Sequence, residues 1–508
     1  MTNPLYDALF SPHAGKSTPF LHLADGTTIT HGAFLEEVAR TANALRELGV
    51  TPGDRVAVHV TKSPQALALY AACIRSGAVF LPLNTAYTPR ELAYFLGDSG
   101  AALVVCDPDE AEDLSAIATQ TGAALKTLDA AGQGTFCDVV AAQAPTFDTC
   151  PRSADDLAAL LYTSGTTGRS KGAMLTHENL LSNARALVDV WRFGADDVLL
   201  HALPIFHSHG LFVATNVMLL AGGAMVFLPK FDLEAVLARL PDATAMMGVP
   251  TFYTRLLDEP RFTADLTQHM RLFISGSAPL LAETHARFRD RTGHDILERY
   301  GMTETSMSTS NPYDGARRAG TVGMPLPGVE AKICDAQTGA QRPTGEIGVL
   351  WVRGPHVFKG YWQMPEKTRE ELMEDGWFIT GDLALIDEQG YIHIVGRGKD
   401  LIISGGYNIY PKEIELFLDA LPGVLESAVI GAPHPDFGES VVAVLVPEAG
   451  AEIDIAHVEA RVRRDLAGFK RPRRIEVMDA LPRNTMGKVQ KNQLRAQFET
   501  AFQQAARA

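Results

Sequence analysis

Short runs of apolar and β-branched residues alternate along most of the chain with longer stretches whose apolar positions follow a helical period. The runs predict strands at Arg55–Val60, Val79–Leu83, Ala102–Cys106, Ala158–Thr163, Val198–Leu203, Ala224–Leu228 and Leu272–Ser275. The helical periods predict helices at His31–Leu48, Ser63–Ser76, Glu178–Val190 and Leu233–Leu240. Strands and helices that alternate in this way indicate an α/β fold with a largely parallel, helix-covered sheet.

The pattern changes twice toward the C-terminus. Between Gly320 and Tyr391, short strands punctuated by glycine and proline predict a β-rich subdomain. After Gly396 a smaller α+β unit is predicted, with elements at Pro411–Asp419, Ser427–Gly431, Val441–Val446, Asp454–Leu466 and Arg474–Met478. The 508 residues also exceed the roughly 250–300 that one core supports. We therefore expect a large N-terminal domain over residues 1–396 and a small mobile C-terminal domain over residues 397–508.

One stretch, from Val198 to Pro229, contains no Asp, Glu, Lys or Arg, so its composition is similar to that of a membrane-spanning segment. A membrane-spanning helix needs about 20 predominantly apolar residues in one piece. Pro204, Asn216 and the pair Gly222-Gly223 interrupt this stretch. We therefore expect two buried strands around a short helix.

Composition narrows the class of protein. Hydrophobic residues make up 46% of the chain and charged residues 21%, as in soluble globular proteins. The net charge of −15 disfavours nucleic acid or an anionic membrane surface as the main partner. No signal-peptide pattern begins the chain, and the five cysteines form no Cys-x-x-Cys pair, so we expect a reducing cytoplasm without disulfides or a zinc site.

A segment rich in glycine and hydroxyl groups follows the predicted strand that ends at Thr163. It reads Tyr162-Thr163-Ser164-Gly165-Thr166-Thr167-Gly168-Arg169-Ser170-Lys171-Gly172. Glycine lets the backbone approach a ligand closely, and hydroxyl and N–H groups donate to phosphate oxygens beside the Lys171 cation. The spacing departs from the Walker pattern because Gly172 follows Lys171. The segment therefore predicts phosphate binding without the chemistry of a P-loop kinase.

This segment resembles the phosphate loop of the adenylate-forming superfamily, which includes acyl-CoA synthetases. Five further motifs of that family follow in order: Pro204-Ile205-Phe206-His207, Tyr300-Gly301-Met302-Thr303-Glu304, Thr380-Gly381-Asp382, Gly396-Arg397-Gly398-Lys399-Asp400 and Pro482-Arg483-Asn484-Thr485-Met486-Gly487-Lys488. The resemblance implies two half-reactions that use ATP, Mg²⁺ and CoA. A carboxylate first attacks the α-phosphorus of ATP to give an acyl-adenylate and pyrophosphate, and a thiol then displaces AMP to give a thioester.

The resemblance also implies a nucleotide site. Its phosphate contacts would be Thr163, Ser164, Gly165, Thr166, Thr167, Gly168 and Lys171. The adenine and its surroundings would be bound by Ser277, Ala278, Glu298, Arg299, Tyr300, Gly301, Met302 and Thr303. Asp382, with Arg397 close by, would bind the ribose hydroxyls, and Glu304 with Thr163 would hold Mg²⁺. Without the resemblance, Glu304 would read as a solvated loop glutamate and Asp382 as a turn residue.

The predicted C-terminal domain carries three implied roles. Lys488 would bridge the substrate carboxylate and the α-phosphate during adenylation, and its acetylation by a lysine acetyltransferase is a hypothesis for control. Lys399 would be the hinge. CoA would contact Gly405, Gly406, Tyr407 and Arg473, the last within seven basic residues from Arg461 to Arg474 that face only Asp465. A solvated helix face explains that basic cluster equally well.

Long stretches resemble malonyl-CoA synthetases more specifically, among them MGVPTFYTRLL and ERYGMTETSMSTSNPYDG. This resemblance implies that Arg255 and Ser277 bind the distal carboxylate of malonate. It also implies that His207, a catalytic candidate, shapes the α-carbon side of the pocket with Ser208 and Met307. Ser208 stands where threonine or valine is common, which leaves room for methylmalonate. From the residues alone, Arg255 would instead be a helix residue paired with Asp258 or Glu259.

Three alternatives stay open at this point. The first is an acyl-CoA synthetase for another small or aryl acid, and the second is a free-standing adenylation domain that loads a carrier protein. No carrier-like segment with a modifiable serine follows Lys488, which argues against a modular synthetase. The third is a non-catalytic adenylate-binding protein, which would be expected to lack Lys488 or Glu304, and both are present.

Overall fold

The computed structural model describes residues 2–163, 170–404, 407–435, 437–484 and 487–502. The chain divides into two compact units, one formed by residues 1–331 and 352–378 and the other by residues 332–351 and 379–508. The boundary expected from the sequence, between residues 396 and 397, separates the large domain from the small domain that is expected to move. It stays a prediction.

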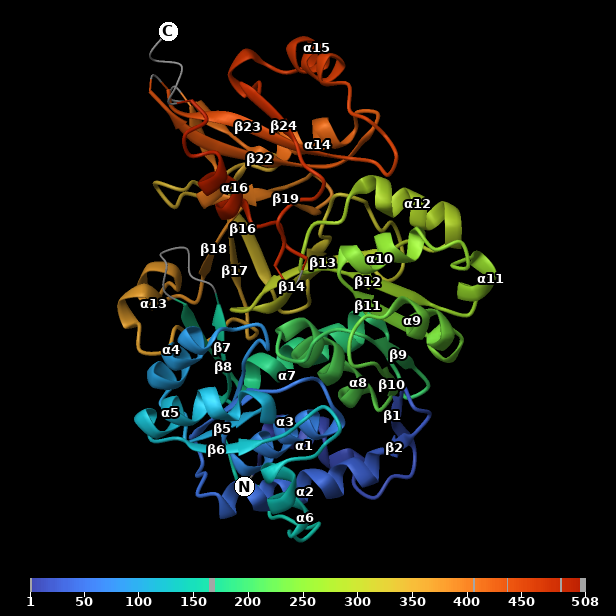
Figure 1. Cartoon of the computed structure of the whole chain (residues 1–508), viewed down its shortest axis with the longest axis vertical. Coiled ribbons are helices and arrows are strands. Elements are labelled where there is room, and N and C mark those ends of the chain that lie inside the picture. The colour runs from blue at the N-terminus through green and yellow to red at the C-terminus, as the bar shows by residue number, and fades with distance from the viewer. Residues whose placement is uncertain (1, 164–169, 405–406, 436, 485–486, 503–508) are drawn as a thin grey trace. The chain divides into compact units, whose positions relative to one another are not determined.

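One sheet of the first unit supports the predicted phosphate loop (Figure 1). Its strands lie in the order β6-β5-β3-β4-β7-β8, with bounds β3 Arg55–His59, β4 Val79–Pro82, β5 Leu103–Cys106, β6 Ala124–Thr127, β7 Leu157–Thr163 and β8 Lys171–Thr176. All pairs are parallel except β7 with β8. Every residue of β4 and β5 is buried, as in parallel sheets covered on both faces.

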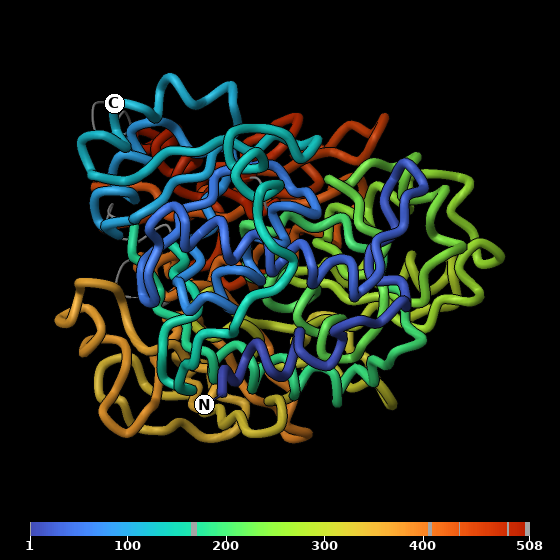
Figure 2. Tube along the Cα trace, turned by 90° about the horizontal axis from the view of Figure 1, so that it is seen from below, coloured from blue at the N-terminus to red at the C-terminus, as the bar shows by residue number. Residues whose placement is uncertain are grey.

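The second sheet of this unit carries the predicted substrate and adenine segments. Its order is β15-β14-β13-β12-β11-β9-β10-β1-β2, with bounds β1 Pro19–Leu23, β2 Thr28–Thr30, β9 Val198–His201, β10 Ala224–Phe227, β11 Ala245–Gly248, β12 Leu272–Ser275, β13 Leu297–Met302, β14 Ser306–Ser310 and β15 Met324–Pro325. Because β1 pairs with β10, the dark-blue start of the chain runs beside the green segment in Figure 2.

The helices of the first unit are fixed at their ends by the signals the sequence carries. Their bounds are α1 Pro4–Leu9, α2 His31–Glu47, α3 Pro64–Ser76, α4 Pro89–Ser99, α5 Ala111–Thr121, α6 Thr135–Ala141, α7 His177–Trp191, α8 Asn216–Ala221, α9 Leu233–Arg239, α10 Pro250–Leu257, α11 Ala264–Thr267, α12 Ala282–Thr292 and α13 Pro365–Glu371. Thr30 caps α2, and Ser63 caps α3, which ends at the left-handed Gly77. These caps satisfy backbone groups that the helix leaves unpaired, so the predicted helices begin and end within a residue or two of their expected places.

The second unit contains two sheets. One orders its strands β16-β17-β18-β19 and the other β21-β20-β23-β22 with β24 parallel to β23, and the bounds are β16 Glu330–Cys334, β17 Gly348–Arg353, β18 Phe378–Ile386, β19 Ile392–Arg397, β20 Ile402–Ser404, β21 Tyr407–Ile409, β22 Val424–His434, β23 Gly438–Pro447 and β24 Arg474–Val477. Alternate residues of β22 and β23 enter two apolar clusters, one with α14 (Pro411–Asp419) and α15 (Ile455–Asp465), the other with α16 (Lys491–Gln497). Figure 1 accordingly shows α15 and α16 on opposite sides of this sheet.

The predicted α/β class, with a large N-terminal part and a smaller α+β part, is confirmed. The uncharged stretch is strand, helix and strand as expected, with β9 and β10 flanking a π-helix, His209–Thr215, that continues into α8. No helix in the described part of the chain is both long and apolar enough to span a bilayer. Several elements were not predicted, among them α13, whose sequence PEKTREE has no apolar period, and β11, which is only four residues long.

Candidate active site

The β7–β8 hairpin brings the two ends of the predicted phosphate loop together. Thr163, the last residue of β7, is the register partner of Lys171, the first residue of β8. Ser164, Gly165, Thr166, Thr167 and Gly168 lie outside the described residues. The hairpin therefore holds a cation and a hydroxyl group at the mouth of the glycine-rich segment, where a polyphosphate requires them.

Lys171 is held by side chains that the sequence did not indicate. Its Nζ atom lies 3.2 Å from Glu371 Oε2 and 4.0 Å from the centroid of the Tyr361 ring. Lys171 is 9% exposed, so its charge is largely removed from water. An ion pair and a cation–π contact together fix the direction of this buried side chain.

The Tyr361 hydroxyl joins this cation to the predicted magnesium ligand. Its oxygen lies 3.0 Å from Glu304 Oε1 and 2.6 Å from Glu371 Oε2, so its single proton is shared between the two carboxylates. Burial, the charge of Glu304 and the charge of Glu371 together raise the pKa of Tyr361, so the hydroxyl keeps its proton. Burial raises the pKa of Glu371, but hydrogen bonds from Tyr361 and Lys367 outweigh it and the net shift is downward. Glu304 is 5% exposed and is thereby oriented by a fixed donor.

The carboxylate of Glu304 fits a magnesium ion better than a transition metal. Among the described residues, no group of three or more His, Cys, Asp or Glu side chains gathers into a metal cage. Mg²⁺ is typically bound by one or two carboxylates together with substrate phosphates and water. A single oriented carboxylate near the phosphate hairpin is the donor set that such binding uses.

The segment predicted to bind adenine lies on β13 and on the turn after β12. Only glycine fits at position 276, because a β-carbon there would lie 2.4 Å from Cζ of Arg299. Ser277 follows with a positive φ of 71°. Glu298 Oε1 accepts a hydrogen bond from the backbone N–H of Leu280 at 3.3 Å, which ties the turn to β13. The structure thus joins the two halves of the predicted adenine segment, Ser277-Ala278 and Glu298–Thr303, through contacts within one unit.

A loop of histidines lies against Ser277. The π-helix begins at His209, whose Nδ1 lies 3.1 Å from Ser277 Oγ, and the backbone N–H of His209 donates to His207 Nδ1 at 3.4 Å. Ser208 is 2% exposed. Met307 is also 2% exposed, and Asn183 binds both its N–H and its C=O. Local π-helical turns are frequent at functional sites, which agrees with a role for this loop.

Arg255 lies in the last turn of α10 with its side chain exposed. The alternative pairing with Asp258 or Glu259 is wrong. Asp258 pairs instead with Arg287 and Glu259 with Arg261, the latter at 2.8 Å. Arg255 has no carboxylate partner among the described residues, and its guanidinium lies 5.9 Å from the centroid of the Phe231 ring. An arginine in this state is available to an anion from outside the chain.

In the second unit, Asp382 and Arg397 are already paired. They are register partners on β18 and β19, and Arg397 Nε lies 2.6 Å from Asp382 Oδ1. The Asp382 side chain is 3% exposed and that of Arg397 is 40% exposed. A carboxylate offers about four lone-pair sites. The ion pair therefore fixes the carboxylate and leaves accepting capacity for ligand hydroxyl groups.

Lys399 and Lys488 both lie exposed on the second unit. Lys399 is in a 3₁₀ turn, Gly398–Asp400, next to Asp400, which pairs with Arg495 at 2.6 Å. The backbone N–H of Lys488 donates to Asn484 Oδ1 at 2.9 Å, and its C=O accepts from the Asn484 N–H at 3.0 Å. These two bonds fix the backbone of Lys488.

The basic cluster from Arg461 to Arg474 does not face only Asp465, and that prediction is wrong. Acids outside the counted stretch pair with two of its members: Glu459 pairs with Arg463 one helical turn earlier, and Glu413 pairs with Lys470 from α14. Arg473 has no carboxylate partner among the described residues, and its guanidinium lies 4.3 Å from the Phe437 ring centroid. Of the other predicted CoA contacts, Gly405 and Gly406 lie outside the described residues, as does the side chain of Tyr407.

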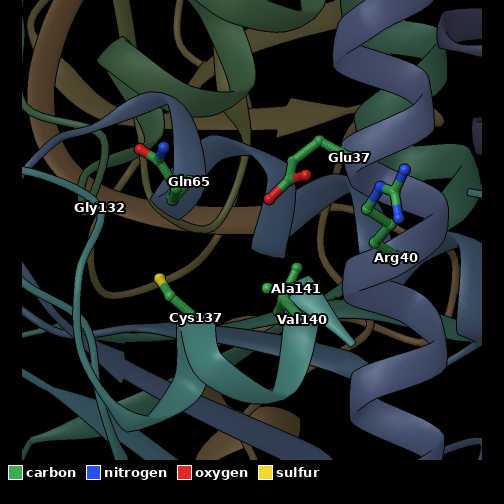
Figure 3. Close-up of a pocket in the computed structure, with 7 residues that line it drawn as sticks. All are labelled: Glu37, Arg40, Gln65, Gly132, Cys137, Val140 and Ala141. Carbon is green, nitrogen blue, oxygen red and sulfur yellow. The ribbon is translucent and has the colours of Figure 1, made fainter. Parts of the chain in front are cut away.

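A separate cavity of about 450 Å³ contains none of the predicted site residues. Figure 3 shows its lining, which is Glu37, Arg40, Gln65, Gly132, Cys137, Val140 and Ala141. Burial, and after it the charge of Glu37, raises the pKa of the Cys137 thiol to about 11. The thiol is therefore protonated at neutral pH and is a poor nucleophile.

Sequence reasoning missed Tyr361, Glu371 and His209. Tyr361 and Glu371 are distant in sequence from Lys171 and Glu304, and no pattern links the four residues before the chain folds. His209 lies two residues after His207, the histidine of the motif. This short spacing is the signal from which a role for His209 could have been predicted.

The comparisons with known proteins agree on the family. Residues 12–362 match the family described as AMP-binding enzyme, and residues 413–488 match the AMP-binding enzyme C-terminal domain. A feruloyl-CoA synthase from an Amycolatopsis species is 40% identical over 97% of this chain and 98% of the relative. A malonate–CoA ligase from Arabidopsis thaliana is 34% identical over 97% of this chain and 89% of the relative.

Among solved structures, ATP-bound MatB from Rhodopseudomonas palustris is 56% identical with a TM-score of 0.97, and the match covers 99% of this chain and 100% of that one. A benzoate CoA ligase from Burkholderia xenovorans is 28% identical with a TM-score of 0.88, over 97% and 100% of the two chains. This chain therefore belongs to the AMP-binding enzymes and is an adenylate-forming acid–thiol ligase.

Proposed function

We propose that the chain is a malonyl-CoA synthetase, which converts malonate, ATP and CoA into malonyl-CoA, AMP and pyrophosphate through a malonyl-adenylate. The observation that carries the choice of acid is Arg255, an exposed arginine on α10 without a carboxylate partner among the described residues. A dicarboxylate has a second anionic end that needs such a cation, whereas a fatty or aryl pocket would leave it unpaired. Malonate–CoA ligases among the relatives support the same choice.

The competing candidate is an acyl-CoA synthetase for an aryl acid, which the feruloyl-CoA synthase relatives favour. Ferulate has a single carboxylate, and this carboxylate is the reacting group. An aryl acid would therefore leave the Arg255 guanidinium without an anion. The 56% identity to MatB exceeds the 40% identity to the feruloyl-CoA synthases, which also favours malonate.

The first half-reaction must bring two anions together. Lys171 would bind the polyphosphate, and Glu304 would hold Mg²⁺, which supplies charge neutralisation at the phosphates when bound. Arg255 and Ser277 would bind the distal carboxylate and so direct the other carboxylate toward the α-phosphorus. His207, Ser208 and Met307 would enclose the α-carbon of malonate. Lys488 would neutralise the two oxyanions as they join, because a flexible ammonium can arrive at this contact and leave again.

Two of the predicted segments would bind the nucleoside of ATP. Glu298, Arg299 and Tyr300 lie on β13 and would line the adenine site, while Asp382, oriented by Arg397, would accept hydrogen bonds from the ribose hydroxyls.

In the second half-reaction, the CoA thiol attacks the acyl-adenylate and AMP leaves. We propose that rotation about Lys399 exchanges the residues needed for the two steps, since a few backbone dihedrals can absorb a large domain movement. Arg473, which has no acidic partner in the described part of the chain, would contact a CoA phosphate. The exposed Lys488 would also be accessible to a lysine acetyltransferase, and acetylation would remove its charge.

A substrate panel tests the proposal. Purified protein is assayed for carboxylate-dependent release of pyrophosphate and AMP with malonate, methylmalonate, acetate, benzoate and ferulate, each with and without CoA. We expect malonate to give the highest kcat/KM and methylmalonate to be accepted less well. Mass spectrometry should detect malonyl-CoA. No AMP from malonate, with turnover of ferulate or benzoate, would establish the aryl-acid candidate instead.

Replacing Lys399 by proline should separate the two half-reactions. Proline fixes φ near −65° and so prevents the backbone rotation that the hinge requires. Malonate-dependent exchange of pyrophosphate into ATP should survive, while malonyl-CoA formation should fall on the order of 100-fold. Lys399→Ala is the matched control, because it removes the same side chain and leaves φ free. Full malonyl-CoA formation by the proline variant would show that Lys399 is not the hinge.

A further inference from the structure

Ser277 makes a buried contact that its predicted role in malonate binding does not require. Its Oγ lies 3.1 Å from Nδ1 of His209, which is 1% exposed, while Ser277 itself is only partly buried. A serine hydroxyl has one proton and two lone pairs. Which atom of this pair donates therefore decides whether Ser277 can still donate a proton to a ligand.

The surroundings of the imidazole favour one tautomer. The Nε2 atom of His209 is buried and has no hydrogen-bond partner among the described residues. A proton on Nε2 would be a buried, unsatisfied N–H, which is costly and rare in native proteins. A proton on Nδ1 is satisfied by Ser277 Oγ. His209 is therefore the donor in this contact, and the Ser277 proton must point to another acceptor.

Burial and a neighbouring cation keep the imidazole neutral. Burial, followed by the charge of Arg299, lowers the pKa of His209 well below 6.5. Arg299 is 4% exposed, and burial lowers its own pKa to about 9, so it remains charged at neutral pH. A neutral His209 has one proton to place, and the preceding argument places it on Nδ1.

A second buried network fixes the loop that carries His209. Lys62 Nζ lies 2.7 Å from Nδ1 of His201, and His201 Nε2 lies 2.8 Å from the carbonyl oxygen of Gly210, the residue after His209. The Gly210 carbonyl oxygen can only accept, so His201 donates from Nε2. Burial holds the pKa of His201 well below 6.5, so the neutral ring accepts at Nδ1 from Lys62. The Gly210 carbonyl also accepts from Thr215 Oγ1 at 3.0 Å. Two donors, His201 Nε2 and Thr215 Oγ1, thus fix the backbone next to His209.

We propose that His209 is a positioning residue for malonate, which donates its Nδ1 proton to Ser277 and thereby aims the Ser277 hydroxyl proton at the distal carboxylate. The inference rests on the proposed function and deepens it, since it assigns the direction of one hydrogen bond in the same pocket. His209 would not touch the substrate. Its loss should weaken malonate binding only through Ser277.

The test is a double-mutant cycle between His209→Leu and Ser277→Ala. Each variant should raise the KM for malonate about tenfold, the size expected for one hydrogen bond to a charged group. The double variant should raise it no more than Ser277→Ala alone, to within about twofold. For His209→Leu, kcat/KM for acetate, which has no distal carboxylate, should not change. His209→Asn, whose amide N–H₂ lies near the position of Nδ1, should restore most of the malonate KM.

A matched control is His177→Leu, which removes another buried histidine of the first unit. It should leave the malonate KM unchanged. The proposal would be overturned if the KM for malonate of the double variant rose by the product of the two single increases. An unchanged malonate KM in His209→Leu would overturn it as well. If Ser277→Ala itself has no effect, the assignment of Ser277 to the distal carboxylate fails together with this inference. If the wild-type protein does not use malonate, the proposed function fails instead, so the failures are distinguishable.

Discussion

Replacing Lys488 by alanine should reduce malonate-dependent adenylation on the order of 1000-fold and leave the second half-reaction largely intact. Removal of one preorganised donor from a developing oxyanion typically lowers kcat roughly 100–1000-fold. Lys488 would serve two oxyanions at once. The first half-reaction is measured as malonate-dependent exchange of pyrophosphate into ATP. The second is measured as malonyl-CoA formation from synthetic malonyl-adenylate and CoA, which bypasses the need for the ammonium.

Three variants sharpen this result. Lys488→Gln, which mimics acetyl-lysine, should match the alanine variant, and this would support control by acetylation. Lys488→Arg keeps the charge but not the compact shape of the ammonium, so it should recover only part of the rate. Lys126→Ala, on β6 of the first unit, is the control for loss of a lysine and should leave both half-reactions unchanged. Equal losses in the two half-reactions of the alanine variant would remove Lys488 from its proposed role.

The sequence predicted the parts of the fold that depend on local signals. The strands β4, β5 and β12 are runs of buried residues, and such runs are visible without any knowledge of their neighbours. Helix α3 has a serine cap, a proline at its first position and a glycine at its end, so its limits could be read directly. The motif residues Lys171, Asp382 and Lys488 were likewise found because their neighbours along the chain identify them.

The contacts that orient those residues could not be predicted in the same way. Tyr361 and Glu371 meet Lys171 only after the chain has folded, and Glu371 belongs to a short charged helix with no apolar period. The π-helix at His209 has no propensity signal, because it depends on how Gly210 packs against Pro204, where a β-carbon would lie 2.0 Å from the carbonyl oxygen. The partners of the basic cluster were misread because Arg463 and Lys470 pair with acids outside the counted stretch.

Replacing Arg255 by leucine should reduce kcat/KM for malonate on the order of 100-fold and raise the relative use of acetate and butyrate. A charge-assisted hydrogen bond to a carboxylate contributes about 1.5–3 kcal/mol, and a bidentate arginine pair lies at the upper end. The effect should appear mainly in KM for malonate, because the arginine would bind the distal carboxylate equally in the ground and transition states. Leucine offers butyrate an apolar contact in place of an unpaired cation. The preference for malonate over butyrate should therefore fall both because malonate binds less well and because butyrate binds better.

The control for this variant is Arg261→Leu. Arg261 is also an exposed arginine of the first unit, but it is satisfied by Glu234 and Glu259 within the chain. Exposed ion pairs of this kind contribute little, so its loss should leave the order of substrates unchanged. The two arginines differ in whether the protein itself supplies their anion. A substrate panel in which Arg255→Leu keeps the wild-type preference for malonate would show that another cation binds the distal carboxylate, and the choice of acid would then have to rest on the relatives alone.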